Sequence, residues 1–590
     1  MNITRNLLVA LFLLLAVPAW SATYYFKSAN RGGSDANDCL SKVNACATWN
    51  KVDTILAADC GPHTFLFEAE SNGADAIPGT WVDPGSCAGT AGNRMVFDYW
   101  SDTLSGPTTL PEITGLKVIS KVWQQYLSTN VYSIKKTDGW SYPAIETQPF
   151  MVFINGDRLN DVDWDTNIET TYPLMSAGTF TIDDSDTVDR RVYVWTSDST
   201  DPTFSIVQGA SIDGFIKADY YADNGVDYYT VQNLKFTGGN AVCLRFGTGP
   251  LKINSTGITI NNVTFENCGL QAASISGPSA ILTNSSAYDC GGSKHFILDT
   301  GAFSIFNTDA ASDVSNNYVE TTRNGTAFEL GFNANGTRVH HNTTSKINHH
   351  CVEIFGGGTD FTVDHNYCDL RNPTFPDPGG YSFSLADDTT GNDFLNNIVL
   401  GGSAGAIRIK AVTGGTVANN TFIGGDDEWS YAAIFAYANS SDFSVINNVF
   451  KSTKAGQRAI IDEDSTGATL FDYNIYGFVS NAFTARPNYC YSDACAITNF
   501  ATWQSTMGYD ANSLLTDPLL ENDYKLQSTS PAIDAGFLFS GASTLTDYEG
   551  NARVNGLIDI GSYEYQTPDP TPGGNGKVQL RGFRGRIRIH

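Results

Sequence analysis

A short asparagine-containing phrase recurs through the middle of the chain and limits the fold more than any other feature. It reads apolar-x-Asn-Asn-apolar, or a close variant, and it occurs ten times between residues 231 and 475. Successive copies are 22 to 33 residues apart. A phrase repeated at this period indicates one supersecondary unit stacked on itself. The reference asparagines are Asn233, Asn262, Asn284, Asn317, Asn342, Asn366, Asn397, Asn420, Asn448 and Asn474.

Each repeat unit lacks a helical pattern long enough for a crossover helix. Short runs of alternating apolar and polar residues, separated by Gly-rich turns, predict about three short strands per unit. Stacked coils place equivalent residues about 4.8 Å apart. An inward-facing asparagine amide then donates to one neighbour and accepts from the next. We therefore predict an all-β solenoid with an asparagine ladder, whose members are structural and not catalytic.

Two further groups of motifs lie at the ends of the repeat array. Near the N-terminus a strand-like segment, residues 23–26, precedes residues 33–35 and 47–49, and residues 530–536 and 559–565 lie near the C-terminus. Together with the repeat, these segments resemble the secreted bacterial right-handed parallel β-helix proteins of the pectate-lyase-like superfamily. The resemblance implies a right-handed parallel β-helix with an N-terminal cap, a C-terminal β module and export. It does not imply one particular reaction.

Composition and patterning divide the chain into six segments. Arg5, an apolar run over residues 7–17 and a small-x-small site at residues 19–21 predict a secretory signal peptide. The apolar run is shorter than the roughly 20 residues that span a bilayer, so we expect a secreted protein (extracellular, periplasmic or cell-surface) with no membrane span. The segments are a signal peptide (1–21), an N-terminal cap with first coils (22–131), an inserted β region (132–212), regular coils with the asparagine ladder (213–480), a C-terminal capping module (481–566) and a Pro/Gly linker with a basic tail (567–590).

Charge and cysteine content narrow the function and the compartment. A formal net charge of −27 repels phosphate backbones, which excludes general nucleic-acid binding. The eleven cysteines all follow the predicted signal peptide, so disulfides are expected. The close pairs are Cys39 with Cys46, Cys60 with Cys87, and Cys490 with Cys495. The odd count leaves at least one thiol free, and the cysteines within the repeats are expected as buried thiols or stacked pairs: Cys243, Cys268, Cys290, Cys351 and Cys368.

Two glutamates occupy equivalent positions in consecutive repeats. Glu329 follows Asn317 by 12 residues, and Glu353 follows Asn342 by 11, each between inward-facing apolar neighbours. Adjacent coils should bring the two carboxylates about one rung, roughly 5 Å, apart, near the spacing of retaining glycosidases. One pKa of such a pair is expected to rise. Alternatively, the pair shares Ca²⁺, or it belongs to a solvated acidic strip.

Basic residues are scarce, and six of them fall in the same half of the stack. Arginine binds a uronate carboxylate bidentately, and Lys or Arg can accept the adjacent proton. The resembling polysaccharide lyases use such a constellation, often with Ca²⁺. In this version Lys346, Lys410 or Arg408 is the base, and the other cations hold the carboxylate. The six residues are Arg323, Arg338, Lys346, Arg371, Arg408 and Lys410.

Five of the eight histidines fall between residues 340 and 365. His341 and His365 both precede a ladder asparagine, so we expect them to stack on consecutive coils. A structural role is favoured for them over an acid/base role at a groove. His349 and His350 lie in a turn before a strand and are better functional candidates, with His350 as a catalytic group and His349 at the substrate.

These features favour a secreted carbohydrate-active enzyme that acts on an extended, uronate-containing polysaccharide. β-Elimination is slightly preferred over hydrolysis by Glu329 and Glu353. The alternative from another class is a non-catalytic surface, adhesive or fibre-forming protein, which the low charge density and the basic tail also fit. Aromatic residues expected to stack on sugar rings are Tyr381, Trp429 and Tyr431.

Overall fold

The computed structural model describes residues 21–566 with internal gaps. The gaps are residues 73–74, 80–81, 86, 103–108, 119–121, 136–150, 163–170, 184–190, 206, 211–214, 219–225, 240, 248–253, 292–300, 324, 374–379, 426–431, 464–466, 487–495, 540–545 and 555. Almost all of the predicted signal peptide and the whole basic tail therefore lie outside the described residues. The same holds for Trp429, Tyr431, Cys490 and Cys495, and these predictions stay predictions.

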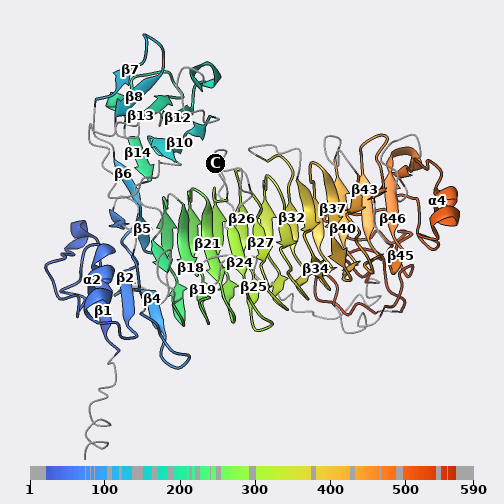
Figure 1. Cartoon of the computed structure of the whole chain (residues 1–590), viewed down its shortest axis with the longest axis horizontal. Coiled ribbons are helices and arrows are strands. Elements are labelled where there is room, and N and C mark those ends of the chain that lie inside the picture. Colours follow the sequence, from blue (N-terminus) through green and yellow to red (C-terminus); the bar gives the residue numbers. More distant parts are fainter. Residues whose placement is uncertain are drawn as a thin grey trace, which may run out of the picture.

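The described chain is a right-handed parallel β-helix, as predicted, built from three parallel sheets that run along the stack (Figure 1). In the regular region each coil adds one strand to sheet A, one to sheet B and one to sheet C, in that order. The predicted three short strands per repeat are confirmed.

The strands of the three sheets have the following bounds. Sheet A contains β1 (Thr23–Phe26), β2 (Thr64–Glu68), β4 (Met95–Trp100), β16 (Tyr229–Gln232), β19 (Thr259–Asn261), β22 (Ile281–Thr283), β25 (Asp313–Ser315), β28 (Arg338–His340), β31 (Thr362–Asp364), β35 (Asp393–Leu395), β39 (Thr416–Ala418), β42 (Ser444–Ile446) and β45 (Leu470–Asp472). Sheet B contains β3 (Ile77–Pro78), β5 (Glu112–Thr114), β17 (Lys235–Thr237), β20 (Thr264–Glu266), β23 (Ser286–Tyr288), β26 (Tyr318–Glu320), β29 (Thr343–Ser345), β32 (Tyr367–Asp369), β36 (Ile398–Leu400), β40 (Thr421–Gly424), β43 (Val449–Ser452) and β46 (Ile475–Phe478). Sheet C contains β15 (Ile216–Ala218), β18 (Val242–Phe246), β21 (Gln271–Ser276), β24 (Phe303–Phe306), β27 (Phe328–Gly331), β30 (Val352–Phe355), β33 (Tyr381–Leu385), β37 (Gly405–Lys410), β41 (Ile434–Tyr437), β44 (Ile460–Glu463) and β47 (Ala485–Arg486). A short pair, β34 (Thr389–Thr390) and β38 (Val412–Thr413), lies outside them.

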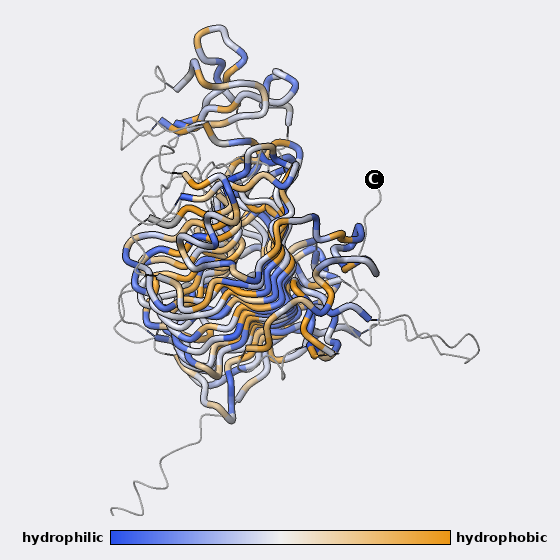
Figure 2. Tube along the Cα trace, turned by 90° about the vertical axis from the view of Figure 1, so that its right-hand side faces the viewer, coloured by the Kyte–Doolittle hydropathy of each residue, from blue (hydrophilic) through white to orange (hydrophobic). Residues whose placement is uncertain are grey.

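The core fills the inside of the coils. Because side chains alternate across a strand, each sheet turns one row inward, and equivalent apolar residues stack from coil to coil. Hydrophobic and hydrophilic residues consequently form separate stripes along the stack (Figure 2). Complete burial of each large apolar side chain contributes about 1.5–3 kcal/mol. In sheet C the inward row, no member of which is more than 2% exposed, is Phe303, Phe328, Val352, Phe383, Ile407 and Ile434.

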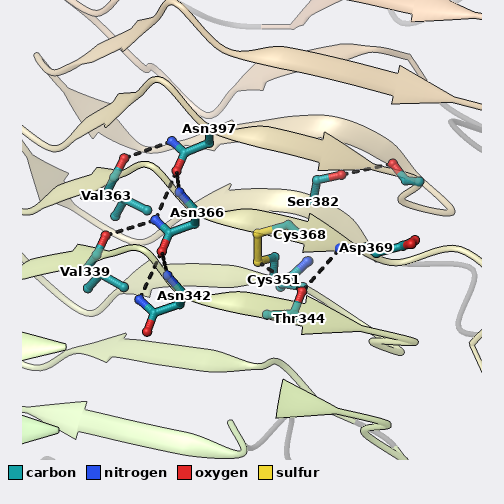
Figure 3. Close-up of a disulfide and its surroundings, with 12 residues drawn as sticks. Val339, Asn342, Thr344, Cys351, Val363, Asn366, Cys368, Asp369, Ser382 and Asn397 are labelled. Atoms are coloured by element: carbon teal, nitrogen blue, oxygen red, sulfur yellow. Dashed lines mark hydrogen bonds between the residues drawn. A yellow bond between two sulfur atoms is a disulfide. The ribbon is translucent and has the colours of Figure 1, made fainter. Parts of the chain in front are cut away.

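A ladder of buried asparagines follows the corner between sheets A and B (Figure 3). Asn366 shows the pattern: its Nδ2 donates to Asn397 Oδ1 and to the Val339 carbonyl, both at 3.0 Å. Its Oδ1 accepts from the backbone N–H and the Nδ2 of Asn342. Every polar atom of the amide is satisfied without water. The ladder members are Asn317, Asn342, Asn366, Asn397, Asn420, Asn448 and Asn474.

The expectation of ten asparagines in one phase is wrong for the first three copies of the phrase. Asn233, Asn262 and Asn284 stand one position earlier, at the turn residue with φ between 52° and 56°. Asparagine tolerates this left-handed conformation better than most residues, so an asparagine at this position makes the turn, and the residue after it occupies the ladder position. In the first three coils the ladder position itself holds Leu234, Val263 and Ser285.

Both ends of the stack are covered. At the N-terminus α2 (Asn50–Ala58) follows Trp49, whose fully buried ring lies 5.2 Å from Phe67 and 5.4 Å from Phe97. At the C-terminus α4 (Phe500–Met507) has Asn499 as its N-cap residue, and the Asn499 side chain accepts a hydrogen bond from the first turn of the helix. These caps hide the open edges of the coil stack.

The C-terminal module packs on the outside of the stack at the corner between sheets A and B. Asn447 Oδ1 accepts from Phe537 N, and His365 Nε2 lies 2.9 Å from the Asp547 carbonyl oxygen. The outward residues of sheet A under this module are apolar and buried. The covered residues are Leu395, Ala418 and Ile446.

Three disulfides occur in the described chain. The predicted pairs Cys39–Cys46 and Cys60–Cys87 are confirmed. A third disulfide joins Cys351, which directly precedes strand β30 of sheet C, to Cys368 in strand β32 of sheet B, and it lies inside the coil (Figure 3). The remaining described cysteines are buried thiols, Cys243, Cys268 and Cys290. Structural disulfides are typical of exported proteins, and no helix among the described residues is long and apolar enough to cross a membrane.

An inserted β region interrupts the early coils and projects from one side of the stack (Figure 1). It begins at residue 116, earlier than the expected 132, because the first of its strands pairs within it. Its two sheets contain β6 (Leu116–Val118), β7 (Gln124–Gln125), β8 (Tyr132–Lys135), β9 (Val152–Ile154), β10 (Asp157–Arg158), β11 (Asn160–Asp161), β12 (Thr179–Asp183), β13 (Arg191–Trp195) and β14 (Val207–Ala210).

Candidate functional site

The outer face of sheet C carries a row of polar residues in register across consecutive coils. Glu329 on β27 pairs in register with Glu353 on β30, so the prediction that the two carboxylates occupy adjacent rungs is confirmed. The predicted alternation, with apolar residues inward and charged residues outward, is confirmed in the same strands. The row runs Ser274, Ser304, Glu329, Glu353, Ser384, Arg408 and Phe435.

Glu329 accepts hydrogen bonds from a serine hydroxyl and a backbone amide. Its Oε2 accepts from the Ser304 hydroxyl at 2.5 Å and from the Gly301 N–H at 3.0 Å. Gln271 Nε2 donates to the same Ser304 Oγ, which orients the hydroxyl proton toward the carboxylate. Glu329 is only 8% exposed, so the carboxyl group is positioned by its neighbours instead of moving freely in solvent.

Glu353 is held by a cation. Its Oε1 lies 2.7 Å from Arg408 Nη2 and accepts from the Ser384 hydroxyl at 3.2 Å. Arg408 Nε also donates to Ser384 Oγ, so the three side chains form a closed set across three rungs. A guanidinium at this distance stabilises the ionised carboxylate. The two glutamates therefore sit side by side in different electrostatic surroundings.

His350 lies behind Glu353 and is completely buried. Burial, and then the charges of His349 and Arg408, lower the pKa of His350 well below its ordinary value, so the imidazole is neutral at pH 7. Its Nδ1 lies 2.8 Å from the Tyr381 carbonyl oxygen, and its Nε2 lies 3.6 Å from Glu353 Oε1. His350 therefore lies next to Glu353 as a buried, neutral imidazole.

His349 and Tyr381 complete this side of the site. The His349 ring centroid lies 3.8 Å from that of His350. The Tyr381 ring lies under the Arg408 guanidinium at 5.8 Å and faces Phe435 at 6.3 Å. Both residues are largely buried, at 8% and 4% exposure. Tyr381 thus packs against the Arg408 side chain, and His349 packs against His350.

An aromatic cluster on the same face was missed by the sequence reasoning. Phe306 and Phe355 are outward residues of β24 and β30, and they flank Gly331 in register. The Phe332 ring lies 5.3 Å from Phe306 and 4.8 Å from Phe355. The strand alternation contained the signal, since it places the side chains of residues 306 and 355 on the outer face.

The other predicted basic residues do not converge on this face. Arg338 lies on sheet A and binds Asp364 through two hydrogen bonds, at 2.8 and 2.7 Å. Lys346 and Arg371 follow strands of sheet B, where Lys346 pairs with Glu320 at 3.1 Å and Arg371 binds Asp369 through two hydrogen bonds. Their positions on sheets A and B separate them from the glutamate pair.

Arg323 joins the inserted β region to the stack. Its guanidinium binds Asp289 at 2.7 and 2.9 Å, and Arg158 of the insert reaches the same carboxylate at 3.0 Å. Burial alone raises the pKa of Asp289, but the two guanidinium groups outweigh it and lower the pKa. Of the predicted cations, only Arg408 and Lys410 lie on sheet C, and Lys410 Nζ pairs with Asp387 at 2.7 Å.

The predicted histidine stack is confirmed. The His341 and His365 rings are stacked with centroids 5.1 Å apart, and both residues occupy the left-handed turn position. His365 Nδ1 lies 2.6 Å from Asp364 Oδ2. This column stands at the corner of sheets A and B, on a different face from the glutamate pair.

The glutamate pair does not fit a calcium site. Ca²⁺ takes six to eight oxygen ligands, yet Glu353 Oε1 already binds a guanidinium, which repels a second cation. Among the described residues no group of three or more His, Cys, Asp or Glu side chains is arranged to hold a metal ion.

No family model matches the sequence, and no curated protein matches it. Among solved structures, that of XylC in complex with xylose aligns with a TM-score of 0.50 and 13% identity, over 73% of this chain and 76% of that chain. A glycoside hydrolase aligns with a TM-score of 0.40 and 10% identity, over 83% of this chain and 99% of that chain. The pectate lyase Pel9A aligns with a TM-score of 0.31 and 12% identity, over 93% and 98%. At these identities the likeness to XylC concerns the fold alone.

Proposed function

We propose that the chain is a secreted carbohydrate-active enzyme that hydrolyses a polysaccharide at Glu329 and Glu353. The observation that carries the proposal is the register of these two residues on the outer face of sheet C. Adjacent rungs put the carboxyl groups roughly 5 Å apart, which suits a retaining mechanism. The XylC structure with xylose and the glycoside hydrolase named among the similar folds are in keeping with a carbohydrate substrate.

The surroundings of the two carboxylates divide their roles. Glu353, bound by Arg408, stays ionised and attacks the anomeric carbon as the nucleophile. Glu329, which accepts hydrogen bonds from Gly301 and Ser304 and lies one rung from that negative charge, carries the proton and delivers it to the glycosidic oxygen. After the leaving sugar departs, Glu329 accepts a proton from water, which attacks the glycosyl-enzyme intermediate and releases Glu353.

The ion pairs favour hydrolysis over β-elimination. A lyase needs a free base beside the abstracted proton and cations for the uronate carboxylate. Here Arg408 is bound to Glu353 and Lys410 to Asp387. The remaining predicted cations are bound to carboxylates on other faces or at the insert.

The test uses the mature chain, residues 22–590, on a panel of xylan, neutral glucans, pectate, alginate and glycosaminoglycans. We expect new reducing ends without the ultraviolet absorbance of an unsaturated uronate, and no loss of activity in EDTA. Glu329→Gln and Glu353→Gln should each lower kcat at least 10³-fold, which corresponds to about 4 kcal/mol. Glu320→Gln, which removes an outward glutamate from sheet B, is the matched control and should keep full activity.

Two results would overturn the proposal. Absorbance that rises together with reducing ends would establish a lyase. A folded protein that binds polysaccharides but produces no reducing ends on the whole panel would establish the non-catalytic alternative.

A further inference from the structure

Phe332 adopts a backbone conformation that its side chain disfavours. It stands at the corner after sheet C with φ +49°. The same corner in the neighbouring coils has φ between 51° and 61° and is made by Asn307, Gly356, Asp387, Ala411 and Ala438. A left-handed residue with a Cβ costs roughly 1–2 kcal/mol, and a bulky one at this position is a genuine outlier. Glycine fits this corner best, so the phenylalanine needs another explanation.

Side-chain packing accounts for only part of the reason why a phenylalanine occupies this corner. The Phe332 ring packs against the rings of Phe306 and Phe355, the two residues that flank Gly331 in register. Aromatic contacts of this kind contribute about 0.5–1.5 kcal/mol, which is comparable to the backbone cost. However, Phe332 and Phe355 both stay partly exposed, whereas Phe306 beneath them is buried. A residue kept only for stability would bury its ring.

The exposed rings lie beside the glutamate pair. Phe355 follows Glu353 by two residues on the same face, and Gly331, which directly precedes Phe332, follows Glu329 by two residues. Residues two apart in a strand are separated by about 6.6 Å. Strained, partly exposed residues concentrate at functional sites, and the inference runs from such an outlier to a function. The rings thus form a wall next to the carboxylates.

The charge of this face selects the ligand. Near the glutamates its cations are Arg408 and Lys410, each bound to a carboxylate, whereas Arg245 lies three coils before Glu329 on the same face. Glu329 adds a further acidic group. A uronate would meet repulsion here, whereas the apolar face of a neutral sugar ring matches an exposed phenyl group. The uronate substrate expected from the sequence depends on cations that lie on other faces.

We propose that Phe332 and Phe355 form a subsite that stacks on a neutral pyranose ring adjacent to the cleaved bond. This inference rests on the proposed hydrolysis at Glu329 and Glu353, and it names the substrate class. The subsite explains why a phenylalanine occupies a corner that glycine fits better.

The test separates binding from backbone strain. Phe332→Gly removes both the ring and the left-handed strain, and Ala438→Gly removes the strain at the equivalent corner of a later coil. On the neutral polysaccharide that the enzyme hydrolyses best, Phe332→Gly should raise KM about tenfold, the equivalent of about 1.4 kcal/mol. Both variants should remain folded, which Tm measurements check, and Ala438→Gly should leave KM unchanged. A KM for Phe332→Gly within twofold of the natural enzyme would overturn the subsite.

A binding assay distinguishes the failure of this inference from failure of the proposed function. Affinity electrophoresis of Glu329→Gln, with and without Phe332→Gly, is run in gels containing xylan, a neutral glucan or pectate. Retardation by a neutral polysaccharide that Phe332→Gly abolishes supports the subsite, whether or not the natural chain is hydrolytic. Stronger retardation by pectate overturns the neutral substrate class even if hydrolysis stands. No retardation in any gel, together with no hydrolysis, overturns both proposals.

Discussion

A buried aspartate in the C-terminal cap should make the stability of this end of the solenoid depend on pH. Asp510 is fully buried and accepts hydrogen bonds from Ser513 at 2.6 Å, Trp503 at 3.0 Å and the Tyr476 hydroxyl at 3.2 Å. Burial raises the pKa of Asp510 from 3.8 to about 6, although these donors act in the opposite direction. The shift corresponds to about 3 kcal/mol.

The direction of the pH dependence follows from which protonation state of Asp510 the folded protein prefers. A raised folded-state pKa means that the protonated carboxyl is favoured, so its stabilising contribution is complete below pH 4 and is lost as the pH rises through 6. Asp510→Asn keeps an acceptor oxygen but cannot ionise. Relative to the natural chain, the variant should therefore gain about 3 kcal/mol of unfolding free energy between pH 4 and pH 8.

The measurement is urea unfolding followed by tryptophan fluorescence, because Trp503 donates directly to Asp510. The difference between the variant and the natural chain is taken at each pH, which cancels the other titrating groups. Asp517→Asn in the same module is the control: its carboxylate pairs with Lys451 and has a lowered pKa, so its difference should be flat from pH 5 to 8. A flat difference for Asp510→Asn over the whole range would refute the reasoning.

Three further predictions concern stability and thiol chemistry. Burial alone raises the pKa of Asp364, but hydrogen bonds from Arg338 and His365 lower it to about 2. This carboxylate therefore stabilises the fold above pH 4, and its contribution of about 2 kcal/mol is lost toward pH 2. In acid unfolding, Asp364→Asn should remove this loss. Asn397→Ala removes four ladder hydrogen bonds and should lower the unfolding free energy by more than 3 kcal/mol. The control is Asn396→Gly, which should not lower the urea midpoint, because the buried Asn396 side-chain amide has no hydrogen-bond partner in the described chain. The buried thiols should react with Ellman's reagent only after denaturation, because the fold shields all three sulfur atoms from the reagent. A fast phase in the native protein would contradict this. These thiols are Cys243, Cys268 and Cys290.

The fold could be predicted because its information is local and repeated. The phrase at Asn342 and Asn366 recurs often enough to fix the period, and alternation within each strand fixes which side chains face inward. The one-residue error at Asn233 arose because a turn asparagine and a ladder asparagine look alike in sequence. Only the structure shows that the first makes the left-handed turn and the second makes the amide ladder.

The site was predicted in part, because the sequence reasoning did not assign each cation to a face of the coil. The distance from the ladder asparagine reports that face: Glu353 and Arg408 both follow their asparagine by 11 residues and lie on sheet C. Lys346 follows by four and belongs to sheet B, and Arg338 precedes by four and belongs to sheet A. Grouping the cations by coil instead of by this offset produced a cluster that does not exist in space.

The ion pairs could not be read from the sequence at all, because Arg408 reaches Glu353 across an intervening strand. Such a contact requires that the register of three coils be held to within one residue. The ladder provides this, since the corner between sheets A and B keeps a constant length while the connection from sheet B to sheet C varies from coil to coil. The connections before β27 and β30 lead into the strands that carry Glu329 and Glu353. A rigid corner opposite a variable edge lets such a fold change the surroundings of the site, and hence the polysaccharide it accepts, without moving Glu329 relative to Glu353.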